Sequence, residues 1–257
     1  MTTHKSRSLL AGAVAIAILF PRLIDAQIGN DNPTGPAGIF NGNITTGCSY
    51  DPYTGNARRA VTDLVVPGSV GAYPLAFSRV ANSRGYEVFS DYQFGEGGWW
   101  RHSYSWYLDI SFGLGQPTQY NVAFPDGRLI IFTPSADDSC FRATPGVRER
   151  FKPLDLNTNL AYLLLPDGGK VEFTATPFYS PFSGYRYLAT GIIDPYGQRT
   201  SLAYNDDGSL NTIQEPGGRW LQIVYQLDPW PQWQGRPEHN IDHVQSSDGR
   251  VVQYYYD

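Results

Sequence analysis

The stretch Leu210–Tyr225, "LNTIQEPGGRWLQIVY", contains the pattern that decides the fold. Around Gly218, apolar or aromatic residues stand eight and five positions before the glycine and three, five and seven positions after it. The last three positions alternate, and alternate side chains of a β-strand point to one face of a sheet. "EPGG" supplies the glycine that a tight turn needs. The stretch therefore predicts a β-hairpin with one apolar face.

The same spacing recurs around Gly197 and Gly249, largely around Gly168 and in part around Gly127. Ten additional residues after Tyr225 explain why the last two glycines of the series lie 31 rather than 21 residues apart. A lone hairpin is marginal in water, so neighbouring hairpins must stack. The sequence predicts an all-β fold, a curved antiparallel sheet of hairpins. Its repeat positions are Gly168, Gly197, Gly218 and Gly249, with Tyr204, Tyr225 and Tyr256.

Composition agrees with many short strands and argues against one class of partner. Gly and Pro contribute 27 and 19 of the 257 residues, and aromatic residues make up 14%. Without residues 1–26 the chain keeps 16 basic and 23 acidic side chains, a net charge of −7. Nucleic-acid binding needs a basic surface, so we expect no nucleic acid as partner.

The first 26 residues are typical of a secretory signal peptide. Lys5 and Arg7 precede an apolar run, Leu9–Phe20, and Ala26 offers a cleavage site. The run of 12 residues is shorter than the roughly 20 that a spanning helix needs. We therefore expect bacterial-type export to the medium or the cell surface, with no membrane span after cleavage. In that compartment Cys48 and Cys140 have two alternatives, one disulfide or two separately buried thiols.

Several stretches together resemble a known family. "DPYGQRTSLAY" (194–204), "YNDDGSLNTI" (204–213) and "SSDGRVVQYYYD" (246–257) resemble the YD repeats of RHS proteins. Residues 51–84 and "FGEGGWWRHSYSWYLDI" (94–110) resemble the segments that open such proteins. The resemblance begins near residue 47 and implies a spiral β-sheet that closes as a hollow shell.

In that family the activity usually lies in a variable C-terminal toxin, which an aspartyl self-cleavage releases. This sequence contains about five hairpin units and neither a self-cleavage core nor a toxin. We therefore expect three parts: a signal peptide (1–26), an RHS-like β segment (27–110) and irregular hairpins that appear incomplete at the C-terminus (111–257). The final strand, Val251–Tyr256, is expected to leave an open aromatic edge that could pair with another copy.

Candidate catalytic residues follow no recognisable spacing. Asp91, Glu96 and Asp109 lie in the central segment, and Asp206 and Asp207 fit a turn. They give a glycoside hydrolase the third place among the possible functions.

Histidines offer equally little. His239 and His243 stand four apart beside Glu238, which suggests a metal, but both fall at a strand entry where their side chains need not converge. His102 alternates with Tyr104 and later apolar residues as on one strand face, and we expect it to be packed. No metal or cofactor signature is present, so no cofactor is expected.

The inserted loop "DPWPQWQGRPEHN" (228–240) is the strongest candidate for binding. Trp230 and Trp233, together with His239, could stack on a glycan or enter a groove of a protein, or the two tryptophans could cap the sheet. Our first hypothesis is a non-enzymatic structural part of a secreted shell that encapsulates or presents a C-terminal effector. The alternative is a secreted or cell-surface binding module for carbohydrate or protein.

Overall fold

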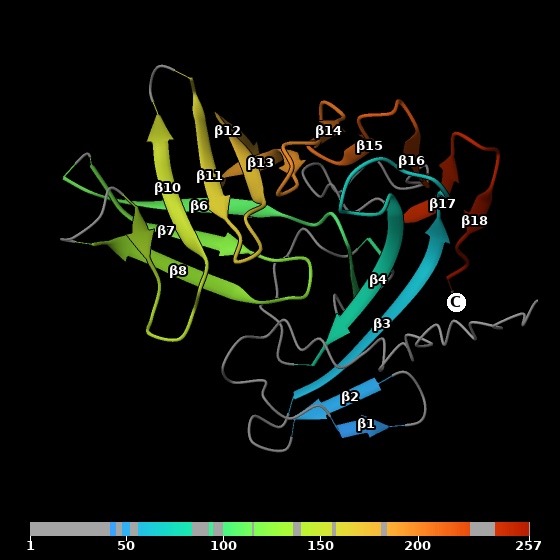
Figure 1. Cartoon of the computed structure of the whole chain (residues 1–257), viewed down its shortest axis with the longest axis horizontal. Coiled ribbons are helices and arrows are strands. Elements are labelled where there is room, and N and C mark those ends of the chain that lie inside the picture. Colours follow the sequence, from blue (N-terminus) through green and yellow to red (C-terminus); the bar gives the residue numbers. More distant parts are fainter. Residues whose placement is uncertain are drawn as a thin grey trace, which may run out of the picture.

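The computed structural model describes residues 42–44, 48–51, 56–83, 93–94, 100–114, 116–135, 140–155, 158–180, 184–226 and 240–256. Every regular element in these ranges is a β-strand, and all strand pairs are antiparallel (Figure 1). The prediction of an all-β antiparallel fold is confirmed. No helix within these ranges has the length and apolar character to cross a membrane.

The first sheet has the strand order β1-β2-β3-β4-β5. Its strands are β1 (Gly42–Ile44), β2 (Cys48–Asp51), β3 (Asn56–Val65), β4 (Ala76–Asn82) and β5 (Trp100–His102). In β3 and β4 alternate residues face the second sheet, among them Leu64 and Phe77.

The second sheet closes on itself. β13 pairs with both β6 and β12, so the strands from β6 to β13 form a closed ring of eight. The ring strands are β6 (Tyr107–Gly113), β7 (Gln116–Ala123), β8 (Leu129–Pro134), β9 (Phe141–Arg142), β10 (Arg150–Asp155), β11 (Leu160–Leu164), β12 (Lys170–Ser180) and β13 (Gly184–Ile193). The predicted division between residues 110 and 111 falls inside β6.

Side chains fill the interior of the ring. Phe132, Phe151 and Phe173 are fully buried there, and the rings of Tyr120 and Phe151 stack with centroids 4.6 Å apart. Aromatic residues bury large areas and pack well at such distances. The ring is therefore a packed core and not a lumen.

Five further strands continue from β13. They are β14 (Arg199–Tyr204), β15 (Leu210–Gln214), β16 (Trp220–Tyr225), β17 (Ile241–Ser246) and β18 (Val251–Gln253), which we call the hairpin stack. Its inward residues pack against the first sheet, with Ile213, Leu221 and Val244 fully buried in the same core as Phe77. Figure 1 shows β3 and β4 lying beside the red end of the chain.

Six of the hairpin turns share one geometry. In the turn at Gly218, the Gly218 N–H donates to the Glu215 carbonyl at 3.0 Å and the Glu215 N–H donates to the Arg219 carbonyl at 3.0 Å. The φ of Gly218 is 87°, a left-handed conformation that favours glycine. A tight turn followed by such a glycine is a common hairpin connection. The same bonds and a positive φ recur at Gly127, Gly168, Gly197, Gly208 and Gly249.

One local expectation was wrong. His102 and Tyr104 do not lie on one continuous strand face, because β5 ends at His102 and the chain turns, with the Ser105 N–H donating to the His102 carbonyl at 2.9 Å. The next strand, β6, begins at Tyr107 in the other sheet. The serines at 103 and 105 favour this turn over continued alternation.

Candidate functional site

The last residue of β3 and the loop that leads to β4, residues 65–75, cross the turns at one end of the hairpins. We call this segment the strap. Its first contact is with the turn between β11 and β12, where the Tyr73 hydroxyl donates to Asp167 Oδ2 at 2.5 Å. At the turn between β13 and β14, the Ala72 N–H donates to Asp194 Oδ2 at 2.7 Å. Two neighbouring residues of the strap thus bind two turns at the same end of the strands.

The order continues at the turn of Gly218. The Val70 N–H donates to Glu215 Oε2 at 2.8 Å, and the Arg219 guanidinium donates to the Gly68 carbonyl. Each strap residue here uses a backbone group, so the contact specifies the path of the strap rather than its side chains.

The last contact lies at the turn of Gly249, where Arg250 Nη1 donates to the Val65 carbonyl at 2.7 Å. From Tyr73 back to Val65 the strap therefore meets the four turns in their order along the chain. We infer that the strap fixes the spacing of the turns at this end of the strands.

The carboxylates of Asp194 and Glu215, in two of the turns, accept the hydrogen bonds from the centre of the strap, and both residues are buried. Burial raises the pKa of Asp194, but hydrogen bonds from the N–H groups of Ala72, Gln198 and Tyr196 outweigh it. The pKa of Asp194 therefore lies below its ordinary value. The carboxylate is ionised and its oxygens are already occupied.

Glu215 is held in the same way. Burial raises its pKa, while the N–H groups of Val70, Gly217 and Arg219 and the charge of Arg219 lower it, with a net decrease. The Val70 and Arg219 bonds measure 2.8 and 3.0 Å. Neither carboxylate is placed to transfer a proton to a substrate.

Close approach of the backbone requires glycine at two places. A Cβ on Gly71 would lie 2.8 Å from Asp194 Oδ2, and the φ of Gly71 is +101°. A Cβ on Gly169 would lie 2.0 Å from the Tyr73 hydroxyl oxygen. The strap and the turns therefore fit only when these positions lack side chains.

Tyrosine hydroxyls join the strands at the other end of the hairpins, through hydrogen bonds that we call the tyrosine latches. In each of three units a tyrosine hydroxyl donates to the carbonyl of the residue 15 positions earlier. The pairs are Tyr204–Ala189 (2.8 Å), Tyr225–Leu210 (2.8 Å) and Tyr256–Ile241 (2.7 Å). Burial raises the pKa of all three hydroxyls, that of Tyr256 to about 12, so each stays protonated and can donate.

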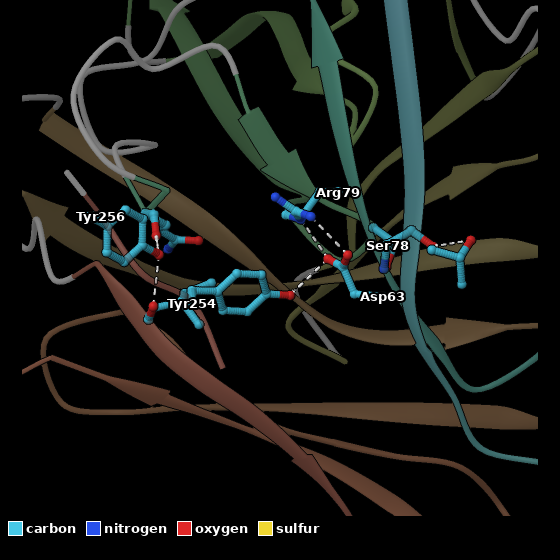
Figure 2. A network of polar contacts seen from close by, with 9 residues as sticks. Asp63, Ser78, Arg79, Tyr254 and Tyr256 are labelled. Atoms are coloured by element: carbon cyan, nitrogen blue, oxygen red, sulfur yellow. Dashed lines mark hydrogen bonds and ion pairs between the residues drawn. The ribbon is translucent and has the colours of Figure 1, made fainter. Parts of the chain in front are cut away.

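The first sheet and the residues that follow β18 meet at a partly buried ion pair (Figure 2). Arg79 donates to both oxygens of Asp63 at 2.6 and 3.0 Å, and the Tyr254 hydroxyl donates to Asp63 Oδ2 at 2.8 Å. The Arg79 guanidinium also lies over the rings of Tyr254 (5.2 Å), Trp100 (5.4 Å) and Phe94 (5.9 Å). This cation–π contact and the bidentate pair fasten β18 to β3 and β4.

The predicted open aromatic edge is therefore wrong in part. β18 is the edge strand of the hairpin stack, but Tyr254 is only 7% exposed and the Tyr256 hydroxyl reaches the carbonyls of Ile241 and Gln93. Tyr255 alone of these tyrosines is largely exposed, at 88%. Alternation places two of the three aromatic rings against the first sheet.

Among the described candidates, the histidines at 102 and 243 have separate surroundings. His102 is buried against Phe77, and burial lowers its pKa to about 3, so it is neutral. His243 contacts Asp242 at 2.6 Å. No cluster of three or more potential metal ligands occurs among the residues described above.

Asp207 is likewise used for structure. Asp207 Oδ1 accepts bonds from the backbone and hydroxyl of Ser209 at 2.9 and 2.6 Å, which is turn chemistry. Asp109 lies on the outer face of the ring, and its burial raises its pKa despite the charge of Arg186. Asp91 and Glu96 lie outside the described residues, and Asp206 is exposed in its turn.

Trp230, Trp233, Glu238 and His239 lie outside the described residues, so binding by the inserted loop stays a prediction. Cys140 is buried. The side chain of Cys48 is outside the described part of the chain, so the disulfide also stays a prediction.

Sequence reasoning missed the strap. A signal was present, because an acidic residue stands three positions before the glycine in two of the turns, at Asp194 and Glu215. The segment 67–74, "PGSVGAYP", combines small residues with prolines, as a chain lying close to another backbone requires. Only the structure shows that the two features meet.

No protein-family model matches the chain, and no curated protein matches it. Among solved structures, the N-terminal domain of effector protein SpvB from Salmonella typhimurium strain LT2 is similar, with a TM-score of 0.44 and 13% identity over 75% of this chain and 92% of that chain. The TcdB2-TccC3-Cdc42 structure gives a TM-score of 0.45 and 13% identity over 74% of this chain and 13% of that chain. TcdB2-TccC3 without the hypervariable C-terminal region gives 0.47 and 14% over 83% of this chain and 13% of that chain.

Proposed function

We propose that this chain is a non-enzymatic structural part of a secreted RHS-type shell, which encloses or presents an effector polypeptide. The observation that carries the proposal is the strap, which binds four turns at one end of the strands, in chain order from Tyr73 to Val65. A segment that sets the spacing of repeated hairpins suits a wall, because a wall needs fixed geometry over many strands.

Polar groups that could perform chemistry serve the fold instead. The oxygens of Asp194 and Glu215 accept backbone N–H groups, and the hydroxyls of Tyr204 and Tyr225 donate to backbone carbonyls. Groups committed to buried hydrogen bonds stabilise a structure and cannot turn over a substrate without breaking it. This use of the polar residues supports a structural role.

An enclosed polypeptide would lie against the outer face of the hairpin stack, since the ring interior is filled. That face carries uncharged polar residues, including Thr212, Gln222 and Gln245, and Gln245 Nε2 donates to Gln222 Oε1 at 2.6 Å. A hydrated polar surface can border an unfolded chain without binding it tightly. Such a surface suits containment.

The proposal is tested by recovering this protein from the culture medium of cells that produce it and digesting the complex with a broad-specificity protease. We expect a copurifying effector polypeptide that resists digestion in the complex and is cut when the complex is denatured. The variant Gly71→Val, which pushes the strap away from Asp194, should leave the effector present but sensitive. A substitution at the exposed Tyr196 is the matched control.

Two results would contradict the proposal. One is recovery of this chain alone from the medium, without any associated polypeptide. The other is an associated polypeptide whose digestion is as fast in the intact complex as after denaturation.

A further inference from the structure

The turn between β6 and β7 exposes two large apolar side chains at one point. Leu114 is fully exposed, and Phe112 is 59% exposed. Of the large apolar residues that the structure describes, Leu114 is the most exposed. Figure 1 shows β6 and β7 on the side of the molecule opposite β17 and β18. This pair, which we call the tip, takes no part in the strap or in the hairpin stack.

The conformation of Leu114 disagrees with its residue type. Gly113 pairs with Gln116, so two residues form the turn, and the φ of Leu114 is +50°. A two-residue turn with positive φ favours Asn or Gly at its first position, and a leucine there is disfavoured. Turn formation therefore does not explain this leucine, whereas a need for an exposed apolar side chain does.

The tip is held in place by its own hairpin. Thr118 Oγ1 donates to the Ser111 carbonyl at 3.2 Å, and a Cβ on Gly113 would lie 2.8 Å from Thr118 Cγ2. The strands pair up to the turn, so backbone polar groups are satisfied close to the tip. Satisfied backbone groups are the first requirement for entering an apolar phase.

Charged residues are absent from the sequence around the tip. The sixteen residues 110–125 contain no Asp, Glu, Lys or Arg. Partner proteins bind through roughly 800 Å² per side with a polar rim around apolar anchors, and a tip of two side chains falls far short of that. A fluid lipid surface accepts two apolar side chains without a matching rim. The chemistry of the tip therefore favours lipid.

We propose that Phe112 and Leu114 insert into the interface of a zwitterionic lipid bilayer. Zwitterionic lipid is favoured because the hairpin has no Lys or Arg to attract anionic headgroups and the chain without residues 1–26 carries a net charge of −7. Two side chains bury less apolar surface than a myristoyl chain, whose binding constant is about 10⁴ M⁻¹, so we expect one on the order of 10³ M⁻¹. The contact is weak and reversible.

The test is sedimentation of the exported protein with sucrose-loaded phosphatidylcholine vesicles at millimolar lipid. Leu114→Asn should lower binding about tenfold while its thermal midpoint stays equal to wild type or rises, since Asn accepts positive φ better than Leu. Phe112→Ser should lower binding by a similar factor. Tyr196→Ser removes an aromatic residue that is 82% exposed in another turn and should change nothing. Adding phosphatidylglycerol should weaken binding.

The opposite direction of the two effects of Leu114→Asn separates insertion from folding. Wild-type protein that stays in the supernatant at millimolar phosphatidylcholine overturns the proposal and would leave an apolar protein pocket as the acceptor of the tip. Binding that Leu114→Asn and Phe112→Ser leave unchanged overturns it as well. The proposed shell function uses neither residue and stands or falls separately.

Discussion

Phe151, at the centre of the closed ring, is surrounded by aromatic rings, whereas Glu215, at one end of the hairpin stack, is surrounded by backbone N–H groups. Both regions consist of antiparallel strands, and the same type of glycine turn occurs in each. The ring has no free edge because β13 pairs with β6 and β12, so packing of its interior suffices. The hairpin stack does not close; its apolar face packs against the first sheet, and the strap and the tyrosine latches add hydrogen bonds at its two ends.

The difference teaches that a repeated hairpin does not determine how its copies are held. Closure replaces specific polar contacts with a filled core, and an open stack needs directional bonds to keep its register. Substitutions in the two regions should therefore differ in size and in reach. The predictions below run from the largest effect to the smallest.

Phe151→Ala should be the most destabilising substitution. Phe151 is fully buried between Tyr120, Phe132 and Phe173, and removal of a buried phenylalanine ring leaves a cavity that costs about 3–5 kcal/mol. Urea unfolding followed by tryptophan fluorescence measures the loss. Phe112→Ala, on the same sheet but 59% exposed, is the control and should cost far less. An equal loss for both variants would show that the ring interior is not the main core.

Glu215→Ala should cost less and act more locally. The substitution removes the acceptor of two part-buried hydrogen bonds, from the N–H groups of Val70 and Arg219, and each such bond contributes about 0.5–1.5 kcal/mol. Hydrogen exchange should increase in residues 65–75 and in the turn at Gly218 before it increases in the ring. Exchange that rises first in β10 and β11 would contradict the division into two differently held regions.

The sequence indicated much of the hairpin stack and little of what holds it. Alternating apolar residues around Gly218 and Gly249 were visible because inward positions of a strand repeat every second residue. Ring closure between β13 and β6 was not, since it joins Tyr187 to Leu108 across a long separation that no local pattern records. Non-local pairing depends on the whole fold.

The candidate site shows the same limit. The spacing of Tyr225 and Leu210 was visible in the sequence, but not that the hydroxyl of one donates to the carbonyl of the other. The strap was missed because its contacts use backbone groups of Val70 and Ala72, and a backbone N–H looks the same in every sequence. The acidic residues at 194 and 215 indicate that something binds at these turns, but not which segment does.

Tyr225→Phe should have a smaller effect than loss of Glu215. The ring of Tyr225 stays packed, while the hydrogen bond to the Leu210 carbonyl is lost, which costs about 0.5–1.5 kcal/mol. The urea midpoint of the variant should fall accordingly. Tyr196→Phe removes a hydroxyl from an exposed tyrosine and should leave the midpoint unchanged. A Tyr225→Phe variant as stable as wild type would mean that the latches set register without adding stability.

The smallest effect should come from protonation of the two carboxylates that the strap contacts, and it should fall on the stack alone. The pKa values of Asp194 and Glu215 are lowered in the folded chain, so folding favours their ionised forms. Their contribution is fully present above the ordinary carboxyl pKa, about 4, and is lost as pH falls through the lower folded values. The urea midpoint should therefore decline more steeply below pH 4 in wild type than in Glu215→Gln, which removes one of the two titrating groups. Parallel curves for the two proteins would mean that protonation of Glu215 does not release the strap. A decline that begins near pH 6 belongs instead to His102, whose pKa burial lowers to about 3 in the folded chain, and it should be the same in wild type and in Glu215→Gln.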